Sequence, residues 1–198
     1  MFNRTSELIV GKLVENGTIA SVEKEIYLFG VQQGLAVLLN IGTTIFIGLM
    51  FGVLWQMLIF TIAYILLRSF AGGYHAKTPI RCFFLSVLLI IVSSSIIKYV
   101  VLHEIVHIAL IVITSVFITI LSPVGNQNKP LDKLEKKVYK KRAVVICFAQ
   151  VFIAVVSLFL GLNTVFFCLT WSLVMVCAMI LIEKINAFIQ YKLRQHTF

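Results

Sequence analysis

A histidine and a cysteine lie close together in a short basic stretch of the sequence, RSFAGGYHAKTPIRC at residues 68–82. A thiol is a strong nucleophile when its thiolate form is stabilised, and a neighbouring imidazole can take its proton and return it later. His75 and Cys82 are therefore candidates for nucleophilic catalysis at a carbonyl group, provided that the chain brings the two side chains within hydrogen-bonding distance.

The residues around Cys82 indicate the start of a helix. Thr78 and Pro79 are typical of a helix cap and a first helical residue, which places Cys82 in the first turn. In that turn the unpaired backbone N–H groups and the helix dipole favour a negative charge. Lys77 and Arg81 add positive charge nearby, so the position suits a thiolate.

The glycines and the proline of this stretch bear on its geometry. In one straight helix His75 and Cys82 would be about 10 Å apart along the axis, too far for a hydrogen bond. Gly72, Gly73 and Pro79 prevent such a helix and allow the segment with His75 to fold back over the helix start. The residues alone leave two interpretations open: a catalytic pair, or a surface loop with an incidental Cys and a solvated His.

Two further side chains are candidates for shaping such a site. Ser86 follows Cys82 by one helical turn, and it either faces the site or bonds back to its own helix, which is the interpretation we favour. Arg68 either holds a substrate carboxylate or anchors the preceding span at the lipid headgroups, and the anchor role is at least as well supported.

The elements that position this stretch follow from composition. Of the 198 residues, 60% are hydrophobic and 13% are charged, and residues 34–67 and 143–182 contain no charge. A span needs about 20 apolar residues, so each window can hold two. We predict an all-α, polytopic membrane protein with six transmembrane helices: two within 30–67, then 82–97, 103–121, 143–160 and 165–182. Gly48 and Gly52 mark either the turn of the first pair or a close helix contact.

Residues 1–28 are predicted to form an amphipathic N-terminal segment, because charged residues interrupt any apolar core that a cleavable signal would need. Phe2, Ile9 and Leu13 would face lipid at the membrane surface. The formal net charge is +9. In a chain this apolar we assign that charge to orientation and to contact with anionic lipid headgroups, and not to nucleic acid.

Basic residues determine the predicted orientation. With six spans, all 17 Lys and Arg residues except Lys98 fall on one side of the membrane. By the positive-inside rule that side is the cytoplasm. Both termini, the candidate catalytic loop 68–82 and a basic loop at 123–142 are therefore predicted to be cytoplasmic. The basic loop would bind lipid headgroups.

A second motif competes with the first. HEIVH at residues 103–107 matches the H-E-x-x-H zinc-peptidase pattern, in which His103 and His107 would share a helix face and Glu104 would act as base. A third protein ligand is needed, and no Asp or Glu occurs in any other predicted span. The orientation also places the motif on the side opposite to His75 and Cys82. We interpret it as an amphipathic turn at a span end, and keep an intramembrane zinc protease as an alternative.

The stretch at 68–82 resembles the signature of the AgrB family, the accessory gene regulator B membrane endopeptidases of Gram-positive bacteria. Those proteins carry an R-x-x-x-G-G-x-H-A block with a Cys seven residues after the His, and the matching residues here are Arg68, Gly72, Gly73, His75, Ala76 and Cys82. EKEIYLFG at 23–30 and SPVGNQNKPL at 122–131 are also similar to the family. The resemblance covers most of the chain.

The resemblance implies a single integral-membrane peptidase domain over residues 1–198, and it implies a reaction. The protein would cleave the C-terminal part of an AgrD-type quorum-sensing precursor, with Cys82 as nucleophile and His75 as base and acid. The acyl-enzyme thioester would then be captured by a Cys or Ser side chain of the same peptide, which gives a thiolactone or lactone ring. No cofactor and no metal are implied.

The resemblance also implies partners and a location. They are the AgrD-type precursor, membrane lipids and a second copy of the chain in a homodimer, in the cytoplasmic membrane of a Gram-positive bacterium. The basic loop would additionally attract an acidic tail of the precursor. A non-catalytic transporter or scaffold is the alternative from a different functional class.

Overall fold

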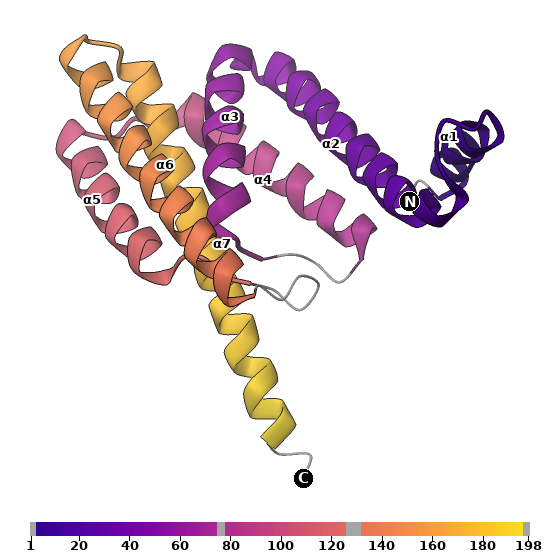
Figure 1. Cartoon of the computed structure of the whole chain (residues 1–198). Coiled ribbons are helices and arrows are strands. Elements are labelled where there is room, and N and C mark those ends of the chain that lie inside the picture. The colour runs from indigo at the N-terminus through magenta and orange to yellow at the C-terminus, as the bar shows by residue number, and fades with distance from the viewer. Residues whose placement is uncertain (1–2, 75–77, 126–131, 196–198) are drawn as a thin grey trace.

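The computed structural model of the chain describes residues 3–74, 78–125 and 132–195. Those residues are mainly helical, with no β-strand among them and one isolated bridge, between Gly72 and Val124. The elements are α1 Asn3–Glu15, the 3-10 turn η1 Ser21–Glu23, α2 Lys24–Phe51, α3 Leu54–Ala71, α4 Pro79–Tyr99, α5 Glu104–Leu121, α6 Lys133–Phe159 and α7 Asn163–Gln195 (Figure 1).

Helices α2 to α7 account for the predicted spans. In the described part of the chain, these six helices are each long and apolar enough to cross a bilayer, and α1 precedes them as a separate helix. The predicted all-α architecture with six spans and an N-terminal helix is therefore confirmed. The chain has the build of a multi-pass membrane protein.

Three of the helices extend beyond the predicted spans. α2 begins at Lys24 and not at residue 30, α6 begins at Lys133 and not at 143, and α7 continues to Gln195 and not to 182. Counting apolar residues predicts how much of a helix can lie in lipid, but not where the helix ends. In α6, Asp132 starts the helix early, because its carboxylate accepts a hydrogen bond from the Lys133 N–H at 2.6 Å and its N–H donates to Glu135 at 3.2 Å.

The sequence left open whether Gly48 and Gly52 make the turn between the first two spans or a close helix contact. The structure assigns one of these roles to each glycine. Gly52 ends α2 with φ of +69°, a left-handed conformation in which glycine is favoured. Gly48 lies one turn earlier, where an added Cβ would be 3.2 Å from the Cα of Leu54. Gly52 therefore makes the turn, and Gly48 allows the two helices to approach closely.

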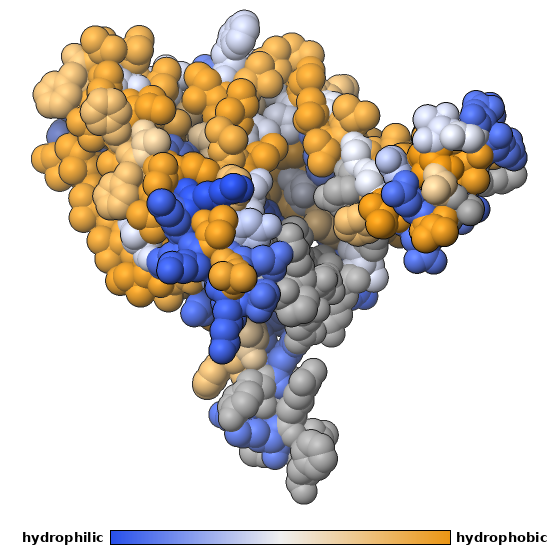
Figure 2. Space-filling model, viewed as in Figure 1, coloured by the Kyte–Doolittle hydropathy of each residue, from blue (hydrophilic) through white to orange (hydrophobic). Residues whose placement is uncertain are grey.

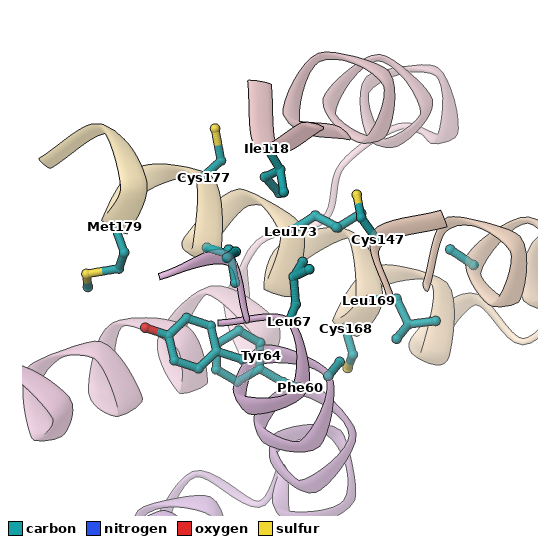
Figure 3. Packing of buried hydrophobic residues seen from close by; sticks show 14 of the residues in the cluster. Phe60, Tyr64, Leu67, Ile118, Cys147, Cys168, Leu169, Leu173, Cys177 and Met179 are labelled. Carbon is teal, nitrogen blue, oxygen red and sulfur yellow. The ribbon is translucent and has the colours of Figure 1, made fainter. Parts of the chain in front are cut away.

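Helix α7 lies at the centre of the bundle. It contacts α3, α5 and α6, while α2 and α4 pack against each other and α2 packs against α3 (Figure 1). Figure 3 shows part of the resulting core, in which Phe60 and Leu67 of α3, Leu173 of α7, Ile118 of α5 and Cys147 of α6 belong to one cluster of buried residues. The α3–α7 contact is close to the segment after α3, whose backbone at Tyr74 bonds to Met179 of α7.

The outer surface of the bundle matches a lipid environment. Large apolar side chains on several spans are exposed, and Figure 2 shows hydrophobic residues over the sides of the bundle. Hydrophilic residues gather at the end where α6 begins, which is the location of the basic segment that starts at Lys133. A soluble protein would bury such apolar area, so this distribution fits a bilayer on the sides and water at that end.

The N-terminal helix is amphipathic, but its faces differ partly from the prediction. On α1, Ser6 and Val10 are buried, whereas Ile9 is exposed as predicted. Leu13 is partly buried, and Phe2 lies outside the described residues. α1 packs against α2, so part of its apolar face serves the contact with α2 and is not available to lipid.

Candidate active site

A cavity of about 410 Å³ lies between α2, α3 and α4 and the connections that follow α3 and α5. Five of the six site residues predicted from the sequence line it, and the sixth, His75, lies outside the described residues. The five are Arg68, Gly72, Gly73, Cys82 and Ser86. The structure thus gathers side chains from the end of one span and the start of the next around a single cavity of ligand size.

Cys82 occupies the predicted position in the first turn of α4. Thr78 caps this helix, since its hydroxyl accepts a hydrogen bond from the Arg81 N–H at 3.4 Å, and Pro79 is the first helical residue. The Cys82 N–H donates to the Thr78 carbonyl at 3.0 Å. The cysteine therefore lies in the first turn of α4, beside the positive end of the helix dipole.

Cys82 also differs from the other cysteines in exposure. It is partly exposed and lines the cavity, whereas Cys147, Cys168 and Cys177 are buried in the packed core. All four are free thiols. A molecule in the cavity can therefore approach Cys82, while the other three cysteines serve as small apolar groups.

Gly72 is required by the close approach of a second backbone segment. Its φ is +80°, and an added Cβ would lie 2.1 Å from the carbonyl oxygen of Val124, in the connection after α5. The Val124 N–H donates to the Ala71 carbonyl at 3.0 Å, which holds the two segments together. The sequence predicted that the glycines interrupt a helix and let the following segment fold back. The structure adds a contact between distant parts of the chain.

Gly73 is required by a contact with α7. Its φ is +136°, and an added Cβ would lie 3.2 Å from the Cβ of Met179. The next residue, Tyr74, donates its N–H to the Met179 carbonyl at 3.1 Å. The backbone immediately before His75 is therefore fixed to the central helix of the bundle.

Arg68 also bonds to the backbone of Tyr74, at its carbonyl group. Its Nη1 donates to the hydroxyl of Tyr64, and its Nη2 donates to the Tyr74 carbonyl at 2.6 Å. The guanidinium also lies over the Tyr64 ring, 5.4 Å from its centroid. The sequence offered a substrate carboxylate or lipid headgroups as partners of Arg68. In the structure Arg68 has partners within the chain, and one of them is the backbone carbonyl of Tyr74, the residue that precedes His75.

Tyr64 is a site residue that the sequence interpretation missed. It is buried, lines the cavity and is one helical turn before Arg68, so the two share a face of α3. The i, i+4 spacing of an aromatic and an arginine on a predicted helix was the available signal. Ser86 was interpreted correctly: its hydroxyl donates to the Cys82 carbonyl at 3.1 Å, within its own helix.

The basic segment at the start of α6 also contributes to the site. Lys140 donates to the carbonyls of Thr119, of Ile120 at 3.3 Å and of Ser122 at 2.7 Å, and so caps the C-terminal end of α5. This holds the end of α5 from which the Val124 segment emerges. At least one lysine of this segment is therefore structural and is not available to lipid or peptide.

The two histidines of HEIVH have different surroundings. His103 is exposed and caps α5, with its Nδ1 accepting from the Ile105 N–H at 3.5 Å. His107 is buried between Phe166 and Phe167, with ring centroids 5.3 and 5.0 Å away. Among the described residues, no third His, Cys, Asp or Glu joins them in a group that could hold a metal. His103 is thus explained as a helix cap, while His107 packs between aromatic rings and its Nδ1 has no hydrogen-bond partner among the described residues. Nothing in the described part of the chain supports the zinc alternative.

Glu183 is a buried carboxylate that the sequence interpretation placed just beyond the last span. Because α7 continues past residue 182, Glu183 lies one turn after Met179 and is only 5% exposed. Its Oε2 has no hydrogen-bond partner in the part of the chain that the structure describes. No pattern in the sequence distinguishes it from the other charged residues of the C-terminal segment.

Comparison with known proteins extends the match beyond this site. The family model described as accessory gene regulator B matches residues 6–181, which include the whole of the 68–82 stretch, the first five spans and most of the sixth. The chain belongs to this family. The family supports a role in the accessory gene regulator system, which involves an AgrD-type peptide at a membrane.

Two relatives share the match over most of their length. A protein of Clostridium perfringens strain SM101 that is named AgrB-like is 29% identical over 182 residues, which are 88% of this chain and 83% of that protein. A second AgrB-like protein, of Clostridium perfringens strain 13, is 26% identical over 87% of this chain and 82% of its own length. No solved structure matches the chain.

Proposed function

We propose that this member of the accessory gene regulator B family is a membrane cysteine endopeptidase. It cleaves off the C-terminal part of an AgrD-type precursor and promotes cyclisation of the part that remains bound as a thioester. The observation that carries the proposal is the position of Cys82, which lies at a capped helix start and opens into a cavity of ligand size. A buried structural cysteine would not need either feature.

The first half of the reaction forms a thioester. His75 takes the proton of the Cys82 thiol, and the sulfur attacks the carbonyl carbon of the scissile peptide bond. The tetrahedral intermediate collapses when its C–N bond breaks, and His75 delivers its proton to the leaving amine. The C-terminal fragment departs as a free amine, and the N-terminal part of the precursor stays bound to Cys82 as a thioester.

The second half closes the ring. A Cys or Ser side chain of the same peptide loses its proton to His75 and attacks the thioester carbonyl. The bond to Cys82 breaks, the proton returns to the Cys82 sulfur, and the product leaves as a thiolactone or lactone. Exchange of one thioester for another is nearly balanced in energy, so a cavity that limits water favours cyclisation over hydrolysis.

The surrounding residues act by positioning. Arg68 donates to the Tyr74 carbonyl, and the Met179 carbonyl accepts from the Tyr74 N–H. These two hydrogen bonds fix the backbone of the residue that precedes His75. The helix start of α4 orients the sulfur. Such preorganisation matters because a misplacement of about 1 Å at reacting groups can cost about 100-fold in rate.

We place the site at the cytoplasmic face. The charge asymmetry that supports this puts the basic start of α6, the C-terminal end of α7 and the Cys82 end of α4 on one side. Both termini are then cytoplasmic. A homodimer, and binding of lipid headgroups or an acidic precursor tail by the exposed basic residues of α6, belong to the same proposal.

The function is tested by precursor cleavage in proteoliposomes, with mass spectrometry of the products. The protein is compared with Cys82→Ser, His75→Ala and the control Cys177→Ser, each with and without a metal chelator. We expect Cys82→Ser and His75→Ala to abolish cleavage, and Cys177→Ser and the chelator to leave it intact. Cleavage that survives Cys82→Ser, or that the chelator removes, would reject the proposal and return attention to His103 and His107.

A further inference from the structure

Tyr64 lines the same cavity as Cys82, and no step of the reaction described so far uses it. Arg68 belongs to the lining of this cavity as well. A negative charge on the Cys82 sulfur acts on the Tyr64 hydroxyl, so the two groups are close enough to interact electrostatically. Figure 3 shows this hydroxyl pointing away from the buried side chains of Leu67 and Cys168. The polar end of Tyr64 is therefore turned away from the packed core.

Two neighbours, one helical turn before and one after, hold the ring of Tyr64. The Phe60 ring stacks on it, with centroids 5.7 Å apart and planes inclined by 15°. The Arg68 guanidinium lies over the ring, 5.4 Å from its centroid. The three side chains follow one another at i, i+4 spacing on one face of α3. The hydroxyl is thus held in place before a substrate binds, which is what electrostatic catalysis requires of a donor.

The hydrogen bonding of Tyr64 leaves its own proton available. The hydroxyl oxygen accepts from Nη1 of Arg68, and a guanidinium has no lone pair with which to accept in return. The hydroxyl proton has no acceptor in the part of the chain that the structure describes. A cation that donates to the phenol oxygen withdraws electron density from it, so the O–H becomes a stronger donor.

The backbone donors next to the sulfur are already engaged. In many peptidases the backbone N–H of the nucleophile donates to the oxyanion that forms on the attacked carbonyl. Here the Cys82 N–H donates to the Thr78 carbonyl at 3.0 Å. The Arg81 N–H donates to the Thr78 hydroxyl at 3.4 Å. Among the described residues, side chains that line the cavity are the remaining candidates for this donor.

We propose that the Tyr64 hydroxyl, polarised by Arg68, is the oxyanion donor for acyl transfer to Cys82. The assignment rests on the proposed function, which supplies the nucleophile. As the sulfur forms its bond to the carbonyl carbon, the π electron pair of the C=O bond moves onto the oxygen. The Tyr64 O–H donates a hydrogen bond to this oxygen and keeps its proton. When the electron pair returns, the bond to the leaving group breaks and the thioester remains.

The proposal distinguishes two reactions of the same thiol. Acylation of Cys82 by p-nitrophenyl hexanoate places negative charge on the carbonyl oxygen in its transition state and releases p-nitrophenolate. Alkylation by iodoacetamide is a displacement at a saturated carbon, and no oxyanion forms. A side chain that only supports the fold or the thiolate affects both reactions, whereas an oxyanion donor affects acylation alone.

Both rate constants are measured in proteoliposomes at pH 7 by mass spectrometry of the Cys82 peptide. The test variant is Tyr64→Phe, which keeps the ring that stacks on Phe60. Tyr139→Phe is the matched control, because Tyr139 also lines the cavity and its ring packs edge-on against Phe70, with centroids 5.9 Å apart. This control also removes one phenol hydroxyl and keeps the ring.

We expect Tyr64→Phe to lower the rate constant for acylation about 100-fold, as loss of one oxyanion donor does in other enzymes, and to leave that for alkylation nearly unchanged. Tyr139→Phe should leave both rate constants unchanged. An equal fall of acylation and alkylation in Tyr64→Phe, an unchanged rate of acylation, or an equal loss of acylation in Tyr139→Phe would overturn the assignment.

Replacement of Tyr64 by 3-fluorotyrosine keeps the test decisive if Tyr64→Phe fails to fold. The fluorinated phenol retains its hydroxyl and is more acidic, so it donates a stronger hydrogen bond while it is protonated. Acylation should then be faster than in the unchanged protein, with alkylation unaltered. Acylation that is no faster would count against an oxyanion donor, because a purely structural role of the ring does not depend on the acidity of the phenol.

The outcome is separable from that of the proposed function. Acylation and alkylation of Cys82 need no precursor, so a selective loss of acylation in Tyr64→Phe would stand even if Cys82→Ser still cleaved a precursor. In the reverse case, loss of precursor cleavage in Cys82→Ser with unchanged acylation in Tyr64→Phe would keep the peptidase and reject the oxyanion donor.

Discussion

Replacement of Gly72 by alanine tests the close contact between Gly72 and Val124. Comparison with a second glycine of positive φ separates the effect of this contact from the cost of placing alanine at a positive φ. The Cβ of Gly72→Ala would lie 2.1 Å from the Val124 oxygen, and an ordinary contact needs at least 3.4 Å. The two backbone segments must therefore separate by about 1.3 Å. Gly161 is the control for a positive φ without a close contact, because its φ is +71° and no atom lies within 4 Å of its added Cβ.

The magnitudes follow from these two geometries. The positive φ alone should cost about 1 kcal/mol in Gly161→Ala. It should cost about 1 to 3 kcal/mol in Gly72→Ala, because the Gly72 ψ of −157° lies in a region that is essentially limited to glycine. Gly72→Ala should lose about 1 kcal/mol more, since the hydrogen bond from Val124 to Ala71 must lengthen or break. The displaced segment leads directly to Tyr74 and His75. A shift of about 1 Å at the reacting groups should lower the rate of precursor cleavage about 100-fold.

The assay measures cleavage rate at saturating precursor in proteoliposomes and the melting temperature of each purified variant. Both variants should melt at somewhat lower temperature than the unchanged protein, and Gly161→Ala should retain its cleavage rate. Equal cleavage by Gly72→Ala and Gly161→Ala would refute the claim that the contact with Val124 positions the site.

The remaining predictions concern Arg68, which bonds to the Tyr74 carbonyl, Lys140, which caps the C-terminal end of α5, and Thr78, which caps the start of α4. Arg68→Lys loses the paired contact with two oxygens, so the maximal cleavage rate should fall about tenfold or more while the KM for precursor changes little. Lys140→Met removes the hydrogen bonds to the carbonyls at the end of α5, so it should lower the free energy of unfolding by about 1 to 2 kcal/mol. The control Lys137→Met changes an exposed position and should leave the free energy of unfolding unchanged. Thermal unfolding of both variants in detergent measures the difference. Thr78→Ala removes a helix cap, so alkylation of Cys82 by iodoacetamide should slow several-fold, and an unchanged rate would contradict the role of the helix start.

The six spans were predictable because their signal is local. A run of apolar residues such as 143–160 marks a lipid-crossing segment without reference to any other part of the chain. Helix ends were less predictable, because the same helix continues through charged turns once it has left the lipid. Lys133 at the start of α6 and Gln195 at the end of α7 belong to such turns.

The position of Cys82 at a helix start was predictable from the sequence, but the architecture of the candidate site was not. Cys82 and Thr78 are neighbours in sequence, so the helix start that orients the sulfur could be inferred from spacing. The contacts of Gly72 with Val124 and of Gly73 with Met179 join segments far apart in the chain, and no local pattern announces them. The role of Arg68 was missed for the same reason, since its partner is a backbone carbonyl whose position only the folded chain defines.

Direct capture of the acyl-enzyme tests the central claim most directly. An AgrD-type precursor that the unchanged protein cleaves is altered so that the Cys or Ser that closes the ring becomes Ala, which removes the group that would release the thioester. The account predicts that the C-terminal fragment is still released and that a peptide adduct, cleavable by hydroxylamine, accumulates on Cys82 and is identified by mass spectrometry. Release of the C-terminal fragment with no adduct on Cys82, or with the same adduct on another residue, would contradict it.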